Sequence, residues 1–484
     1  MSKDEIRFTT IGMVGVGSMR AAMSLLFAEN EYPVFFYDPN KENIDKLRKD
    51  AINLGLDDRI TGRDSYENLC KTIKGEGSPS VFVFNSPHSP VSKKAVEGLL
   101  AGGLKRDDVI IDCANEQQQV TEERQKQLEP KSIHYVGCGV SGGYKSARAG
   151  LSFSPGGSPE AMHRILLFLA QLAARDWSGR PCTGYVGPGG SGHFVKTIHN
   201  GIEQGMMSVL SEVWAVMVRG LGMSYAEAGR VFADWDASGP LRRCFLVRIG
   251  ADVCRAKDQR EENPLGHVPD KVVQDPAATI VSAHLFRYAS AYAGQRKHNK
   301  DAAGGGVDAG RLSGATNREE FLSALRAATF FGFAATFAQG MDLVRARDKK
   351  QGWALGLWRG GCIIQADGIV DIFDEMYARM DRKADDDVLS NYEVARALFE
   401  AFPETKKVVL AAVEADLCVP ALSQSLEYYK YLTSTELPTQ FMEAEMDYFG
   451  KHMFDRKEDP WPGKPRTGQH HFEWKPAKGK LDKL

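Results

Sequence analysis

The sequence lacks a strong excess of charge of either sign. Its 484 residues include 61 Lys and Arg and 63 Asp and Glu, which leaves a formal net charge of −2. A balance this close to zero argues against a dominant attraction to nucleic acid or to an anionic membrane surface. Hydrophobic residues make up 43% and charged residues 26%, an ordinary globular composition that excludes a wholly disordered chain.

Long apolar runs and paired cysteines are missing as well. The longest candidate run, 165–174, is too short to cross a bilayer and is interrupted by Gln171. The first residues, 1–7, contain no apolar core of a signal peptide. The eight cysteines are scattered, and none forms a Cys-x-x-Cys pair, which is typical of reduced thiols. We therefore expect a cytoplasmic protein with no metal site and no membrane or nucleic-acid partner.

Short strand-like runs alternate with helical patterns in the first third of the chain. This alternation predicts a parallel, doubly wound α/β sheet. The expected strands are 7–14, 33–37, 80–84 and 108–112, and the expected helices are 18–29, 41–49, 91–101 and 121–128.

Helical periodicity dominates further along the chain. The expected helices are 193–220, 224–235, 317–349, 369–381, 388–402, 404–416 and 424–431. We predict three parts: a Rossmann-like dinucleotide-binding domain over 1–185, an all-helical substrate and dimerisation domain over 186–454, and a C-terminal tail over 455–484.

A glycine-rich turn joins the first predicted strand to the first predicted helix. Gly15 permits the tight turn and Gly17 allows close approach of a pyrophosphate, whose charge would meet the amides of Ser18 and Met19 at the start of the helix. The third glycine of this fingerprint is replaced by Arg20. The turn therefore indicates dinucleotide binding, with a purely structural turn as the alternative.

Asp38 ends the second predicted strand, about 20 residues after the glycines. A carboxylate here suits the ribose hydroxyls of NAD and repels the 2′-phosphate of NADP. We expect NAD or NADP as cofactor, with NAD favoured. The alternative is that Asp38 only caps the next helix.

Four polar residues recur at helical spacing in the predicted helix 193–220. Lys196, His199, Asn200 and Glu203 stand at i, i+3, i+4 and i+7 and so share one face. An amine, an imidazole, an amide and a carboxylate can support proton transfer in a cleft with shifted pKa values. From spacing alone, a solvated helix face explains them as well.

These residues also carry a family resemblance. The segments 139–143 (Gly-Val-Ser-Gly-Gly) and 192–203 resemble the 6-phosphogluconate dehydrogenases, within the β-hydroxyacid dehydrogenase superfamily. Further matches are Ala338-Gln339-Gly340, Trp358 to Ile364, and Asp447-Tyr448-Phe449-Gly450. The resemblance extends over roughly residues 8 to 455.

The resemblance implies oxidation of 6-phosphogluconate at C3 with loss of C1 as carbon dioxide, giving ribulose 5-phosphate. It assigns Lys196 as general base and Glu203 as the acid that protonates C1 of the enediol. No metal is required for this chemistry. The residues expected to hold the substrate are Asn115, Ser141, Gly142, Gly143, His199 and Asn200, with Asn115 also near the cofactor.

The sequence departs from the family where the substrate phosphate is bound. Gln204 replaces a Tyr, Met446 replaces an Arg, and the segment 268–276 lacks a Lys-Trp-Thr element. Arg296 and His452 are kept. Because Met cannot donate the two hydrogen bonds by which Arg binds a phosphate, we expect the phosphate site to differ from that of the family.

Three hypotheses stay open at this point. The chain is a 6-phosphogluconate dehydrogenase with a rebuilt phosphate site, an NAD-dependent dehydrogenase of another, unphosphorylated 3-hydroxy sugar acid, or a non-catalytic paralogue. The resemblance further implies a homodimer in which the C-terminal segment, with His452, reaches the partner's active site. A disordered tail is the alternative for 455–484.

Overall fold

The structure is a computed structural model. It describes residues 8–73, 79–85, 89–258, 261–267, 293–303, 309–312, 317–347, 354–379, 388–434, 437–450, 452–456, 458–459, 468–472 and 474. The chain divides into two compact units, Met1–Leu426 and Glu427–Leu484. The domain boundaries expected at 185/186 and 454/455 remain predictions.

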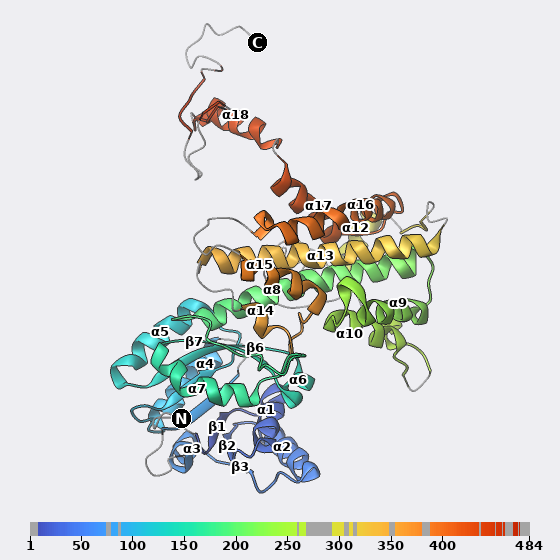
Figure 1. Cartoon of the computed structure of the whole chain (residues 1–484). Coiled ribbons are helices and arrows are strands. Elements are labelled where there is room, and N and C mark those ends of the chain that lie inside the picture. The colour runs from blue at the N-terminus through green and yellow to red at the C-terminus, as the bar shows by residue number, and fades with distance from the viewer. Residues whose placement is uncertain are drawn as a thin grey trace. The chain divides into compact units, whose positions relative to one another are not determined.

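The first unit begins with a seven-stranded sheet that has helices on both faces (Figure 1). The strand order is β3-β2-β1-β4-β5-β6-β7, with β7 antiparallel to β6 and all other neighbours parallel. The strands are β1 (Ile11–Val14), β2 (Val34–Tyr37), β3 (Ile60–Gly62), β4 (Val81–Phe84), β5 (Val109–Asp112), β6 (His134–Ser141) and β7 (Ser152–Gly156). The predicted α/β class is confirmed, although β3, β6 and β7 were not predicted.

Burial on both faces explains why the central strands are apolar throughout. All residues of β1, β4 and β5 are buried, as expected for parallel strands covered by helices on either side. One face packs against α1 (Ser18–Glu29), α2 (Lys41–Leu54) and α7 (Pro159–Leu172). The other faces α3 (Tyr66–Ile73) and α4 (Ser89–Ala101).

Both edges of the sheet are protected. At one edge, β3 is only three residues long. At the other edge, β7 contains Pro155, and the chain that follows α7 lies against it through a bridge between Phe153 and Thr183. A second bridge joins Leu151 to Ala173.

Helices form the rest of the first unit, and the last of them continues past Leu426 into the second unit. They include α8 (Ser191–Ala215), the π-helix η2 (Val216–Gly220), α9 (Tyr225–Ala237), α10 (Phe245–Arg255), α12 (Ala293–Ala302), α13 (Arg318–Arg347), α14 (Ala354–Leu357), α15 (Asp367–Arg379), α16 (Tyr392–Glu414) and α17 (Pro420–Thr433). Beside the sheet, α5 (Gln118–Leu128) and α6 (Tyr144–Ala149) complete the set. Short 3-10 turns join several of them: η1 (Glu129–Lys131), η3 (Gly239–Leu241), η4 (Pro264–His267) and η5 (Val388–Ser390).

The helix α13 is the centre of this helical part. It packs against α8 and α16, and α8 runs alongside it in Figure 1. Its segment Arg318–Val344 is long and apolar enough to span a bilayer, contrary to the expectation that no such run exists, but 78% of its most apolar window is buried inside the protein. Its residues Phe331 and Phe333 are fully buried. Burial of this kind is typical of a core helix.

The helix α16 contradicts the prediction of two helices separated at Pro403. It runs unbroken through the proline. Proline removes one helical hydrogen bond and costs about 3 kcal/mol in a helix interior. Leu398 and Val408, on either side of it, are fully buried. Packing along the whole of α16 against α13 therefore outweighs the local cost.

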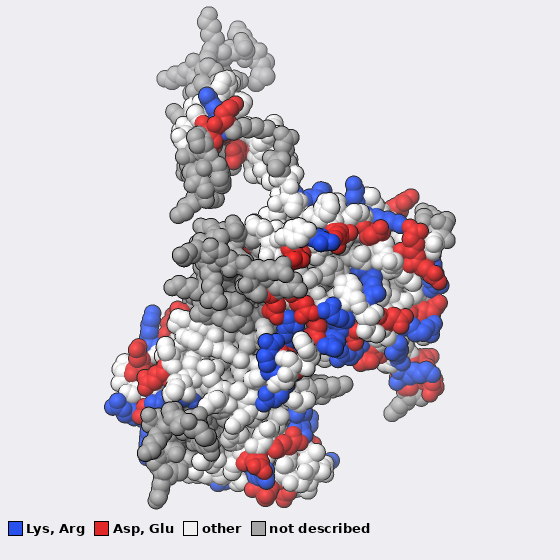
Figure 2. All heavy atoms as spheres, viewed as in Figure 1, with Lys and Arg blue, Asp and Glu red and all other residues white. Residues whose placement is uncertain are grey.

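Mixed charge covers the visible surface of the helical part. Figure 2 shows Lys and Arg interspersed with Asp and Glu over the helices. This agrees with the near-zero net charge of the sequence.

The second unit is organised around Asp447 in α18 (Thr439–Gly450). Its fully buried carboxylate accepts hydrogen bonds from His471 Nδ1 (2.9 Å), Trp474 Nε1 (2.8 Å) and the amides of Met453 (3.0 Å) and Phe472 (3.1 Å). Burial alone would raise the pKa of Asp447, but these bonds lower it well below its usual value. The described part of the tail thus folds onto its own unit.

Candidate active site

The predicted catalytic residues all project from α8. Lys196, Asn200 and Glu203 are half-buried, and His199 is fully buried. Loss of water around the Lys196 amine lowers its pKa, and the nearby carboxylate of Glu203 opposes this shift. The structure therefore places an amine with a lowered pKa and a carboxylate on one partly buried helix face.

His199 is held in a defined, neutral state. Burial and the charge of Lys196 place the pKa of His199 well below its usual value. Its Nδ1 lies 3.2 Å from Asn200 Oδ1, which can only accept, so Nδ1 carries the proton. Nδ1 is also 3.7 Å from Glu203 Oε2, beyond hydrogen-bonding distance.

Cys362 completes this group and was not predicted as a site residue. Its Sγ lies 3.0 Å from His199 Nε2. Burial raises the pKa of Cys362 to about 12, so the thiol keeps its proton and donates to Nε2. The turn that bears Cys362 is fixed by Arg359, whose Nη1 donates to Asp371 of α15 at 2.8 Å. The family match Trp358 to Ile364 was the only sequence signal for it.

The loop after β6 lies against the same turn. Ser141 is buried and hydrogen-bonded to Cys362, and Gly142 has φ +102°. A Cβ on Gly142 would collide with the carbonyl oxygen of Gly361, so only glycine fits there. Gly143, the N-cap of α6, has open space around it. Ser141 and Gly142 therefore lie against the turn whose Cys362 contacts His199.

Asn115 is exposed on the loop after β5, although its neighbours in the loop are buried. Two hydrogen bonds of His193 on α8, which we call the latch, connect this helix to β5 and to α5. His193 Nε2 donates to the carbonyl oxygen of Asp112 at 3.0 Å. The carbonyl can only accept, so Nε2 carries a proton, and in the neutral imidazole Nδ1 accepts from the Thr121 hydroxyl at 2.6 Å, which is closer than the other acceptor of that hydroxyl, the carbonyl oxygen of Gln117, at 3.2 Å. A Cβ on Gly137 would lie 2.7 Å from Thr121 Cγ2, so the backbone of β6 packs directly against the latch.

The expected phosphate contacts are only partly described. Gln204 follows Glu203 on α8 and is half-buried. The backbone of Arg296 lies in α12, while its side chain and the segment 268–276 lie outside the described residues. His452 and Met446 belong to the second unit, where His452 is exposed.

The glycine turn has the geometry expected for a dinucleotide site. Gly15 has φ +76°, and the N-cap of α1 is Gly17, which has no side chain to cap the first amides of the helix. These amides, among them those of Ser18 and Met19, fit the negative charge of a diphosphate.

Asp38 lies beside this turn and is buried. Its Oδ2 accepts from the Val16 amide at 2.6 Å and from Asn43 Nδ2 at 3.2 Å, and its Oδ1 accepts from the Asn40 amide at 2.7 Å. The next helix, α2, is capped by the side chain of Asn40. Asp38 is therefore not the cap, and Oδ1 retains acceptor capacity for a ribose hydroxyl.

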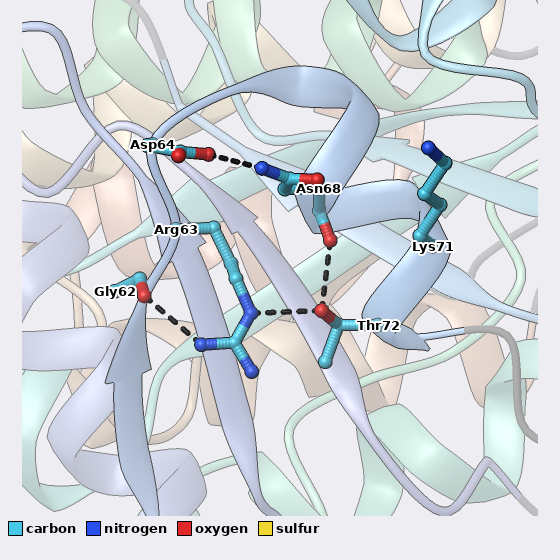
Figure 3. Close-up of a pocket in the computed structure, with 6 residues that line it drawn as sticks. All are labelled: Gly62, Arg63, Asp64, Asn68, Lys71 and Thr72. Carbon is cyan, nitrogen blue, oxygen red and sulfur yellow. Dashed lines mark hydrogen bonds between the residues drawn. The ribbon is translucent and has the colours of Figure 1, made fainter.

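A small recess lies at the carboxyl end of β3, next to β2 (Figure 3). Its lining residues are Gly62, Arg63, Asp64, Asn68, Lys71 and Thr72. Arg63 is held by Nε–H donation to Thr72 Oγ1 at 2.7 Å and by stacking over the ring of Phe35. This recess is built from other residues than the α8 face.

One group of possible metal ligands lies near the amino-terminal ends of β5 and β6. Asp107, His134 and Glu160 bring their ligand atoms within 4.8 Å of one another. Arg164 Nη2 lies 3.0 Å from Asp107 Oδ1 and 3.3 Å from Glu160 Oε1. The guanidinium thus occupies the cation position between these carboxylates, and we assign no metal to them.

Together, a doubly wound sheet with a glycine turn and a helix bearing a half-buried lysine with a lowered pKa define a nicotinamide-dinucleotide-dependent hydroxyacid dehydrogenase. Family models agree. The NAD binding domain of 6-phosphogluconate dehydrogenase matches residues 10–187, and the C-terminal domain of the same enzyme matches 192–275 and 271–474. The chain belongs to the 6-phosphogluconate dehydrogenase family.

Known proteins of the family are similar over their full length. The decarboxylating 6-phosphogluconate dehydrogenase of Emericella nidulans is 35% identical, covering 95% of this chain and 100% of that protein. The NADP(+)-dependent decarboxylating enzyme of Bacillus subtilis is 30% identical, covering 98% and 100%. The Plasmodium falciparum 6-phosphogluconate dehydrogenase, solved with NADP+ and with 6-phosphogluconate, superimposes with a TM-score of 0.83 at 26% identity, covering 96% and 100%.

Proposed function

We propose that this chain catalyses the oxidative decarboxylation of 6-phosphogluconate to ribulose 5-phosphate and carbon dioxide. Full-length similarity to decarboxylating enzymes supports this reaction. The observation that carries it is the α8 face, where Lys196 has a lowered pKa beside neutral His199 and the carboxylate of Glu203. A non-catalytic paralogue would not require this arrangement.

Lys196 acts as the general base in this proposal. Burial favours its neutral form, which can accept the proton of the C3 hydroxyl. A nicotinamide dinucleotide held at the glycine turn by Gly15, Gly17 and the first amides of α1 would supply the acceptor for the hydride from C3. The protonated amine then polarises the C3 ketone, which receives the electron pair when C1 leaves as carbon dioxide.

Glu203, in its protonated form, supplies the proton to the enediol carbon that lost carbon dioxide, which becomes C1 of ribulose 5-phosphate. His199 cannot serve as this acid, because its lowered pKa keeps it neutral. Its role is to position: with Nδ1 donating to Asn200 and Nε2 held by Cys362, it fixes the amide beside the substrate hydroxyls. Asn115, Ser141, Gly142 and Gly143 complete the proposed substrate contacts.

We propose NAD as the preferred cofactor, although the similar Bacillus subtilis enzyme is NADP(+)-dependent. Asp38 supports this preference, because a buried carboxylate at the end of β2 repels a 2′-phosphate. The measurement is cofactor selectivity of Asp38→Asn. Loss of the carboxylate should lower the ratio of kcat/KM for NAD to kcat/KM for NADP. An unchanged ratio would contradict the role of Asp38 in cofactor preference.

The first experiment measures nicotinamide reduction and carbon dioxide release with 6-phosphogluconate and with gluconate, under NAD and NADP separately. Turnover restricted to the phosphorylated acid supports the proposal. Turnover restricted to gluconate would instead support a dehydrogenase of an unphosphorylated acid, as Gln204 and Met446 allow. Lys196→Met should abolish turnover, whereas Lys93→Met, at an exposed lysine of α4, should leave it unchanged.

We further propose a homodimer in which the second unit serves the partner's site. Exposed aromatic and apolar side chains on this unit, among them Phe441, Tyr448 and Phe472, support association with another chain. The eight free cysteines support a reducing, cytoplasmic location.

Complementation tests the shared site. Lys196→Met and His452→Ala should each be inactive as homodimers. A hybrid of the two contains one site with both residues intact if His452 acts across the dimer, so activity should reappear on mixing after dissociation. No recovery, with hybrid formation shown by differently tagged chains, would mean that His452 serves its own chain or none.

A further inference from the structure

Arg20 occupies the position at which the dinucleotide fingerprint normally has its third glycine. It lies in the first turn of α1, and its side chain folds back over the glycine turn. A Cβ built on Gly15 would lie 2.7 Å from Arg20 Cζ, and one built on Gly17 would lie 3.1 Å from Arg20 Nη2. The guanidinium therefore covers both glycines.

The space above Gly17 is where the diphosphate of a dinucleotide approaches the backbone. Gly15 and Gly17 leave room for the guanidinium there, because any side chain at either position would crowd it. The two glycines thus accommodate an arginine in this chain, in addition to permitting the turn.

The guanidinium of Arg20 is placed to donate hydrogen bonds to a bound anion. It is half-buried, and loss of water lowers its pKa while the charges of Asp38 and Tyr66 oppose that shift. Asp38 accepts hydrogen bonds from the Val16 and Asn40 amides and from Asn43, and its attraction to Arg20 is electrostatic, without a hydrogen bond between them. Among the described residues, none accepts a hydrogen bond from the Arg20 guanidinium in the structure.

We propose that Arg20 binds the diphosphate of the nicotinamide dinucleotide and replaces the missing third glycine with a charged contact. Planar guanidinium groups donate two parallel hydrogen bonds to phosphate oxygens, which a backbone amide cannot do alone. The first amides of α1, which no side chain caps, complete the anion site. This proposal rests on the dinucleotide site but not on the identity of the sugar acid.

Binding of ADP-ribose by calorimetry tests the proposal without turnover, because this ligand carries the diphosphate but no nicotinamide. Arg20→Ala should weaken ADP-ribose about 10- to 100-fold, as expected for loss of hydrogen bonds to a charged group. The wild type should also lose affinity more steeply with added salt than the variant. Arg20→Lys should retain part of the affinity.

Arg59→Ala is the matched control, since it removes the same charge before β3, where Arg59 Nη1 donates to the carbonyl oxygen of Ala28 at 3.1 Å. It should leave ADP-ribose binding unchanged, and both variants should bind 6-phosphogluconate as the wild type does. Unchanged or tighter ADP-ribose binding by Arg20→Ala would overturn the proposal. Tighter binding by Arg20→Gly would mean that the side chain obstructs the site. If the wild type binds ADP-ribose but turns over no sugar acid, the proposed reaction fails while this inference stands.

Discussion

The latch between Thr121 and His193 allows a sharp test of how α8 is positioned. Thr121→Val keeps the shape of the side chain and removes only the hydroxyl. Thr121 and His193 are buried, and their hydrogen bond measures 2.6 Å. Because His193 Nε2 must keep its proton for the Asp112 carbonyl, no tautomer can rescue the unpaired Nδ1.

A buried acceptor left without its donor costs about 1–3 kcal/mol. For a chain of this length, that loss corresponds to a fall in Tm of roughly 1–3 °C, since the entropy of unfolding scales with chain length. The catalytic rate should suffer as well, because Lys196 begins the next turn after His193. We expect kcat to fall about tenfold, since small displacements of a catalytic group are costly.

Differential scanning calorimetry measures the change in Tm, and initial rates measure the change in kcat, with Thr197→Val as control. Thr197 is on the same helix and is exposed, and its hydroxyl only donates to the carbonyl oxygen of His193 at 3.0 Å. The control should therefore keep the wild-type Tm and kcat. If Thr121→Val matches the control in both measurements, the latch does not position α8 and the reasoning fails.

Further predictions concern other buried contacts. Gly137→Ala would push a methyl group against Thr121 and His193 and should lower stability by about 1–3 kcal/mol, measured as a loss of Tm that Gly143→Ala, in open space, does not share. Burial raises the pKa of Glu212 to about 8. The stability that this group contributes is therefore fully present below its unfolded pKa of about 4.3 and is lost as the pH rises through 8. Glu212→Gln should flatten the dependence of Tm on pH between 5 and 9, and an equal slope in both proteins would contradict this. Asp447→Asn should speed limited proteolysis after residue 450 without altering ADP-ribose affinity, because it disrupts only the hydrogen bonds within the second unit; an unchanged cleavage rate would show that those bonds do not order the tail. Cys362→Ala should lower kcat by leaving His199 Nε2 unpaired, whereas Cys362→Ser retains a donor and should retain most activity.

The doubly wound sheet was predictable because its central strands are short, apolar and separated by helical patterns. The helix α1 was predicted with its observed bounds, Ser18–Glu29. In contrast, β6 and β7 were missed, since their glycines and serines hide the strand pattern. These glycines are required because α8 packs directly on the two strands, a tertiary constraint that no local propensity reveals.

The site shows the same division between local and distant information. Lys196, His199, Asn200 and Glu203 could be placed together because a single helix repeats them at fixed spacing. Cys362 lies 163 positions from His199, so its contact with the imidazole depends on where the fold places the turn between α14 and α15. Likewise, the sequence showed that Arg20 breaks the fingerprint but not that its side chain turns back over Gly15 and Gly17.

The protected edges of the sheet restrict how copies of this protein can associate. Adding a strand from a second chain requires a free row of backbone donors and acceptors along an exposed edge. At one side only the three residues of β3 are offered, and at the other the chain around Ala173 and Thr183 already takes up the outer face of β7. Association by continuing this sheet from one copy to the next is therefore disfavoured, and contacts between copies have to rely mainly on side chains, which single surface substitutions can disrupt.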